Sequence, residues 1–200
     1  MSTIEFDDYA NNLLVTVAVC QNTLKILEKL KSEHNGLKFA GSGTVEAQIS
    51  QRIAEFLVIK LYCLFDKRSG TLSLENIKNQ VQGTTDSGKA INLHAEYSKI
   101  RNQHHNLIER IRRNRNAGIA HILKDGGLGW DESSLEMFKG IWSDQLKDMG
   151  AVSDDRVYLT YWNFPVDEVK KILTDLKESI LGVLLQNTSV VKQNDYRDRF

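Results

Sequence analysis

An arginine and a histidine stand six positions apart where a basic stretch of the chain ends. The segment reads Arg115, Asn116, Ala117, Gly118, Ile119, Ala120 and His121. A guanidinium keeps its positive charge throughout the physiological pH range, whereas an imidazole gains or loses a proton near neutrality. These two groups can cleave a phosphodiester without a metal ion, because the guanidinium stabilises the charged phosphorane and the histidine moves protons.

Further arginines precede this motif by about one helical turn. Arg112 and Arg113 are placed to hold neighbouring phosphates of a nucleic acid. The stretch has a local excess of positive charge. Its acidic residue is Glu109, and its basic residues are Lys99, Arg101, Arg110, Arg112, Arg113 and Arg115. The whole chain is neutral, with 26 basic and 26 acidic residues. A basic stripe binds phosphates or matches acidic residues within the chain or between subunits, and charge alone does not decide between these roles.

The spacing of apolar residues predicts that helices carry these side chains. Helices are predicted at Glu5 to Lys31, from Val45 to Leu64, at Ser73 to Val81 with Ser73 as N-cap, at Ala90 to His121, around Leu135 to Leu146, and from Pro165 onward. The alternating run Val157 to Phe164 has no partner strand and is interpreted as an extended lead-in to Pro165.

The predicted fold is therefore all-α, a bundle of about five to six helices in one domain spanning residues 1–200. Two hundred residues suit a single domain, although two helical subdomains are an alternative. No internal repeat is found, and the polar residues 186–200 are expected to form a flexible C-terminal tail.

Composition and cysteine usage indicate a cytoplasmic protein without membrane association. The first residues carry Glu5, Asp7 and Asp8 where a signal peptide would have basic residues, and no stretch approaches eighteen apolar residues. Cys20 and Cys63 fall within apolar helical patterns, so we expect two reduced thiols in the core and a reducing compartment.

Two other patterns that could carry chemistry are interpreted as structural. Gly83 to Lys89 has the glycine and lysine spacing of a phosphate-binding loop, but Ala90 replaces the hydroxyl that would hold magnesium, and no buried strand precedes it. His94, His104 and His105 lack the spacing of metal ligands, and His104 is expected to be a hydrogen-bonded core histidine. We therefore expect no metal and no cofactor.

The motif R-N-x-x-x-x-H at the end of a long helix resembles the HEPN superfamily, the higher eukaryote and prokaryote nucleotide-binding domains. The stretch Leu64 to Arg68, followed by Thr71 to Leu74, is similar to the abortive-infection (AbiU-like) branch of that superfamily. The resemblance extends over Leu13 to Leu123 and is looser beyond.

The resemblance implies a helical bundle that forms a homodimer, with two Arg/His motifs facing one cleft. Many members cut RNA there without metal and leave a 2′,3′-cyclic phosphate. It assigns phosphate stabilisation to Arg115, orientation to Asn116 and action on the 2′-hydroxyl or leaving oxygen to His121. It suggests antiphage defence, or a toxin restrained by an antitoxin or another protein partner. Other members are inactive dimerisation or partner-binding modules, which is the alternative function.

The helix geometry sets a condition on this site. Six residues place Arg115 and His121 roughly 120° apart around a straight helix. A loosened turn at Gly118, a helix that ends before His121, a swing of the long arginine side chain, or exchange of motifs in a dimer would bring them together. In the competing interpretation, Arg115 pairs with an acidic residue of the later helices and His121 caps the C-terminus of a helix.

Overall fold

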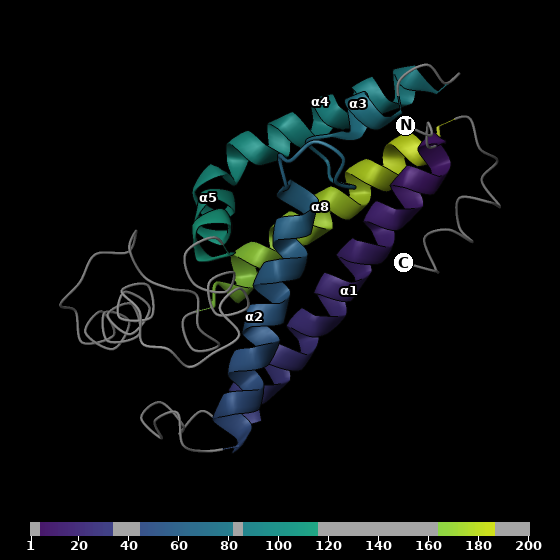
Figure 1. Ribbon diagram of the computed structural model, residues 1–200. Helices are drawn as coiled ribbons and strands as arrows, with labels where there is room; N and C mark the ends of the chain where they lie inside the picture. Colours follow the sequence, from purple (N-terminus) through teal and green to yellow (C-terminus); the bar gives the residue numbers. More distant parts are fainter. Residues whose placement is uncertain (1–4, 34–44, 82–85, 116–163, 187–200) are drawn as a thin grey trace. The chain divides into compact units, whose positions relative to one another are not determined.

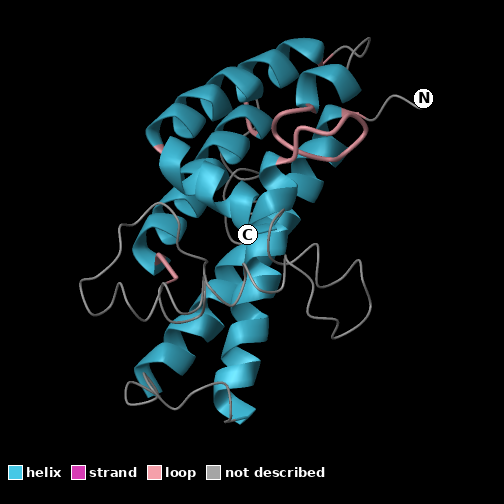
Figure 2. Ribbon diagram, turned by 60° about the vertical axis from the view of Figure 1, so that its left-hand side comes forward, coloured by secondary structure: helices cyan, strands magenta, loops and turns pink. Residues whose placement is uncertain are grey.

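The described part of the chain is entirely helical. The computed structural model describes residues 5–33, 45–81, 86–115 and 164–186 (Figure 1). Those residues form six helices and no strand, and Figure 2 shows the helices in cyan and the described loops and turns in pink. This confirms the predicted all-α class. Within the same residues, no helix is long and apolar enough to cross a membrane.

The helices follow the predicted order. They are α1 (Phe6–Glu33), α2 (Val45–Phe65), α3 (Ile77–Gln80), α4 (Ser87–Gln103), α5 (His105–Asn114) and α8 (Val166–Leu184). The predictions for α1, α2 and α8 are confirmed, and α8 begins directly after Pro165, as expected from proline's preference for helix starts. The helix predicted around Leu135 to Leu146, most of the extended run before Pro165 and the tail after Gln186 lie outside the described residues.

The chain divides into two compact units. Unit 1 comprises Met1–Asn22, Cys63–His105 and Asp167–Phe200, and unit 2 comprises Thr23–Tyr62 and Asn106–Val166. Whether the two units act as a single domain stays a prediction.

Each unit buries apolar side chains from several helices. In unit 1 they include Phe6, Leu13, Val17, Phe65, Leu93, Tyr97, Ile172, Leu176 and Ile180. In unit 2 they include Leu24, Leu27, Leu57, Val58, Leu61, Leu107, Ile108 and Ile111. The spacing of these residues at three and four positions explains why the segments are helical, since that period gathers apolar groups on one face.

A buried tyrosine of α1 fixes the loop between α2 and α3 in unit 1. The Tyr9 hydroxyl donates to the backbone oxygen of Ser73 at 2.8 Å and accepts from the Ser73 backbone N–H at 2.9 Å. Burial raises the pKa of Tyr9 to about 12, against a smaller lowering effect of the Ser73 backbone hydrogen bond. One side chain therefore satisfies both backbone groups of a fully buried loop residue.

The predicted N-cap at Ser73 is wrong. The helix begins at Ile77, and the Ser73 hydroxyl donates to the Asp66 backbone oxygen at 2.6 Å. The Asn76 amide, at the start of α3, also bonds the loop, donating to the Arg68 backbone oxygen at 2.6 Å. The Ser73 hydroxyl and the Asn76 amide thus bond loop carbonyls, and neither side chain caps α3.

The predicted single helix from Ala90 to His121 is also wrong, since α4 ends at Gln103 and α5 begins at His105. Between them, the His104 imidazole nitrogen lies 3.1 Å from the Asp175 carboxylate of α8. We attribute the break to this tertiary bond, which apolar periodicity does not report. The buried stripe of α4 runs through Ala90, Leu93, Tyr97 and Ile100, whereas Ile91 is exposed.

One of the two cysteine predictions fails. Both thiols are free, but Cys20 is buried whereas Cys63 is exposed. The buried face of α2 carries Leu61 and Leu64, and a residue two positions after Leu61 points to the other side of the helix.

We predict that Tyr9→Phe lowers the free energy of unfolding by about 1–3 kcal/mol, because it leaves two buried backbone groups without this partner. Urea denaturation at neutral pH measures the change. As a control, Thr16→Val removes an exposed hydroxyl bond to the Asn12 carbonyl on the same helix and should cost roughly 0.5 kcal/mol or less.

The same pair of proteins tests the shifted pKa. An unfolded tyrosine ionises near pH 10, while Tyr9 in the folded chain stays neutral until about pH 12. The unfolded state therefore releases a proton first, and the parent should lose stability between these pH values by up to about 1.4 kcal/mol per pH unit. An equal pH dependence in Tyr9→Phe would contradict the assignment.

Candidate functional site

The motif arginine lies against an aromatic ring in unit 2. Arg115 directly follows α5, and its guanidinium carbon lies 4.7 Å from the centre of the Tyr62 ring in the last turn of α2. Both side chains are partly exposed. The separation is that of a cation–π contact, which favours a guanidinium laid over a ring face. This contact could not be predicted from the sequence, since the two residues are distant in the chain.

The helix end before Arg115 is held by a side chain. Asn114 is buried, and its amide donates to the backbone oxygen of Arg110 at 2.8 Å. The Arg110 carbonyl lies about one helical turn before Asn114. Asn114 thereby links the final residue of α5 to the preceding turn, at the point where Arg115 emerges.

The two arginines predicted to bind phosphates have different surroundings. Arg112 is buried, and its guanidinium donates to the Glu109 carboxylate at 2.6 Å. Arg113 is exposed. Consecutive helical residues point about 100° apart, which explains the contrast. Of the two arginine side chains, Arg113 is therefore the accessible one, whereas Arg112 forms an ion pair with Glu109.

The other two motif residues, Asn116 and His121, lie outside the described residues. Their roles and the approach of His121 to Arg115 stay predictions. The structure thus gives the surroundings of Arg112, Arg113 and Arg115, and it brings Arg115 together with Tyr62.

The lysine of the Gly83 to Lys89 pattern makes structural contacts in unit 1. Lys89 lies in the first turn of α4 and pairs with Asp86 at 3.3 Å and Asp7 at 3.6 Å. Its ammonium also lies 5.6 Å from the centre of the Phe6 ring. Residues 82–85 are not described. These contacts support the interpretation that the pattern is not a phosphate-binding loop.

Of the described histidines, His94 and His104 are partly buried and His105 is exposed. His104 makes the hydrogen bond to Asp175 described above, as expected of a bonded histidine. Burial lowers the pKa of His94, the charges of Lys78 and Arg101 lower it further, and Glu75 raises it. No group of three or more histidine, cysteine or acidic residues in the described part of the chain could hold a metal ion.

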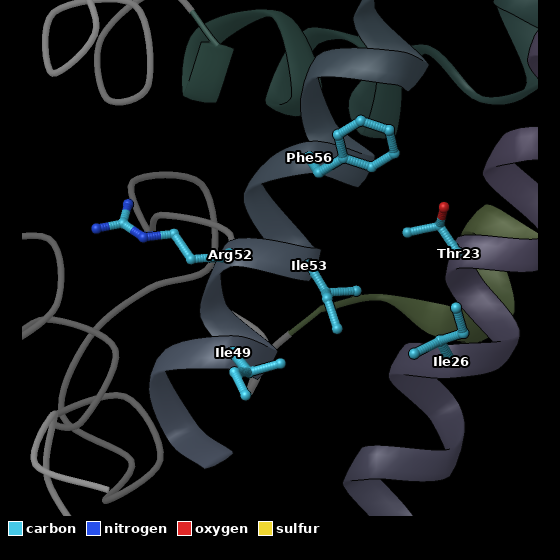
Figure 3. Close-up of a pocket in the computed structure, with 6 residues that line it drawn as sticks. All are labelled: Thr23, Ile26, Ile49, Arg52, Ile53 and Phe56. Carbon is cyan, nitrogen blue, oxygen red and sulfur yellow. The ribbon is translucent and has the colours of Figure 1, made fainter. Parts of the chain in front are cut away.

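An apolar groove of about 540 Å³ forms a second candidate surface in unit 2. Figure 3 shows its lining, which consists of Thr23, Ile26, Ile49, Arg52, Ile53 and Phe56 from α1 and α2. Ile26 and Ile49 are about half exposed, at 52% and 50%, and Phe56 is 42% exposed. The sequence predicted a helix over these α2 residues, from Val45 to Leu64, but did not show that Ile49 and Phe56 would stay in contact with water.

Comparisons of the chain with protein-family models, with curated proteins and with solved structures found no match. Functional interpretation therefore depends on the motif, on its resemblance to the HEPN superfamily and on the placement of the described side chains.

We predict that Glu109→Gln lowers the free energy of unfolding by about 1 kcal/mol, because it removes the carboxylate beside the largely buried Arg112. Thermal and urea unfolding measure this effect. Glu96→Gln is the matched control, since the Lys99–Glu96 pair is exposed on both sides and should contribute roughly 0.5 kcal/mol or less. Equal effects of the two changes would contradict the prediction.

Proposed function

We propose that this protein is a metal-independent endoribonuclease of HEPN type, acting in abortive infection and antiphage defence or as the toxin of a toxin–antitoxin pair. The observation that carries the proposal is the placement of Arg115. Its guanidinium emerges at the end of a basic helix, partly exposed, and lies against the Tyr62 ring. An arginine in such a place can meet a phosphate and keep its charge during the reaction.

In the proposed reaction, the 2′-oxygen of a ribose attacks the adjacent phosphorus and the bond from phosphorus to the 5′-oxygen breaks. A base accepts the 2′-hydroxyl proton, and the leaving 5′-oxygen gains a proton. His121 acts on the 2′-hydroxyl or the leaving oxygen, Arg115 stabilises the phosphorane, and Asn116 orients the site. The products carry a 2′,3′-cyclic phosphate and a 5′-hydroxyl.

The arginines before the motif support RNA binding in this proposal. Arg113 is exposed and can contact a phosphate adjacent to the scissile one. Arg112 is buried beside Glu109, so its part in binding would require that ion pair to rearrange. A homodimer would bring two motifs to one cleft, and an antitoxin or another protein partner would restrain the activity.

We predict that Arg115→Ala and His121→Ala each lower the rate of RNA cleavage in EDTA by about 10²–10⁴-fold. Loss of Arg115 removes charge stabilisation, and loss of His121 removes proton transfer. The assay uses labelled single-stranded and transfer RNAs. Lys99→Ala is the matched control, because it removes one positive charge from an exposed site on α4 and should leave the rate within about twofold.

Circular dichroism and light scattering establish that the variants keep the fold and oligomeric state of the parent. Parent-like cleavage by Arg115→Ala would contradict the assigned role of Arg115. Failure of the folded parent to cut any of the RNAs would contradict the proposed activity itself.

The alternative function is a non-catalytic HEPN-like dimeric module that binds a protein partner or a nucleic acid without cutting it. The groove with the exposed side chains Ile26, Ile49 and Phe56 is a candidate surface for dimerisation, because apolar groups gain stability when a second protein surface covers them. The occupant we assign to it is a second copy of this chain, since both functional interpretations include a dimer.

We predict that Ile49→Asp converts a dimer of the parent into a monomer in multi-angle light scattering, because a carboxylate would be buried in the interface without a partner. Ile91→Asp on α4 is the matched control, since Ile91 is 57% exposed and lies outside the groove. If the parent and the Ile49→Asp variant have the same mass in light scattering, this role of the groove is contradicted.

A further inference from the structure

We infer that Tyr62 is a positioning residue for Arg115, holding the guanidinium ready for the phosphate of the RNA. This inference rests on the proposed function and adds to it a residue outside the Arg/His motif. It is drawn from the 4.7 Å approach of the guanidinium carbon to the centre of the Tyr62 ring.

The ring is well anchored as a support. Tyr62 lies in the last turn of α2, next to Leu61 and two positions before Leu64, both of which are fully buried. The packing of these neighbours fixes the helix on which the ring stands. Tyr62 itself is partly exposed, so one part of the ring is available to the arginine.

A cation–π contact suits an arginine that must bind a phosphate. The guanidinium is planar with its N–H donors in that plane, and its attraction to a ring arises from its charge and not from a hydrogen bond. Contact with the ring therefore uses no hydrogen-bond donor of Arg115. Those donors are the groups that form paired hydrogen bonds with phosphate oxygens.

The electrostatics of the contact differ from those of the ion pairs nearby in sequence. Arg101 pairs with the Glu75 carboxylate at 3.2 Å, and Arg112 pairs with the Glu109 carboxylate at 2.6 Å. A carboxylate offsets part of the positive charge that a phosphate would meet. A tyrosine ring attracts a guanidinium without adding a negative charge beside it, so the ring contact itself leaves the charge of Arg115 unchanged.

Positioning also meets the geometric condition set by the sequence. Arg115 and His121 diverge by roughly 120° on a straight helix, and an arginine has many rotamers of similar energy. A ring that selects a small set of those rotamers reduces the conformational entropy lost when the phosphate binds in its reactive arrangement. Removal of the ring should therefore slow the chemical step more than it weakens binding of RNA.

The test measures kcat and KM for RNA cleavage in EDTA for the parent, Tyr62→Phe and Tyr62→Leu. Tyr62→Leu should lower kcat by about 3- to 30-fold with a smaller change in KM, since it removes the ring. Tyr62→Phe keeps the ring and should stay within about twofold of the parent. Cys63→Ser, at the exposed neighbouring position, is the control and should leave kcat unchanged.

A measurement on the parent protein keeps the test independent of how well the leucine variant folds. Nuclear magnetic resonance should show the side-chain protons of Arg115 shifted upfield by the Tyr62 ring current, with the shift retained in Tyr62→Phe. A parent spectrum without this shift would overturn the inference.

The kinetic outcomes separate the inference from the proposed function. Parent-like kcat in Tyr62→Leu, or an equal loss in Tyr62→Phe and Tyr62→Leu, would overturn the positioning role while RNA cleavage by the parent stands. If the parent cuts no RNA, the proposed function fails and the inferred role in catalysis fails with it.

Discussion

Polar groups that this chain removes from water must find partners, and this constraint determines much of its local structure. Tyr9 satisfies both backbone groups of Ser73. Asp66 is almost fully buried, and its carboxylate pairs with the Arg68 guanidinium at 2.6 Å. An unpaired group in these places would cost about 1–3 kcal/mol, comparable with a large part of a domain's net stability.

The same constraint distinguishes the arginines of the basic stretch. Arg101 and Arg112 approach carboxylates, whereas the described contact of Arg115 is with the Tyr62 ring. A guanidinium that is paired with a carboxylate stabilises the protein at the expense of its ability to attract an anion. The ring contact of Arg115 adds no negative charge beside its guanidinium, and this is the feature that we propose suits the motif arginine to act on a phosphate.

The sequence predicted the helices well where apolar periodicity was uninterrupted, as in α1, α2 and α8. It failed where a tertiary contact altered the local pattern. The break at His104 coincides with a bond to Asp175 on a distant segment, and the late start of α3 follows from loop carbonyls that recruit the Ser73 and Asn76 side chains.

For the candidate site, residue types could be predicted but their surroundings could not. The sequence identified Arg112, Arg113 and Arg115 as a group because they are close in the chain. It could not show that Arg112 is buried beside Glu109, that Arg113 is exposed, or that Tyr62 lies beneath Arg115, since burial and long-range contacts depend on the packed fold. The exposure of Cys63 was missed for the same reason.

The central claim is that Arg115 belongs to a site where the RNA's own 2′-hydroxyl attacks the phosphate. The most direct measurement compares an RNA with the same RNA carrying a single 2′-deoxy sugar at the cleaved position, both incubated with the protein in EDTA. We predict cleavage of the unmodified RNA to a 2′,3′-cyclic phosphate end and no cleavage at the deoxy position. Equal cleavage of both molecules, or a 3′-hydroxyl product, would contradict it.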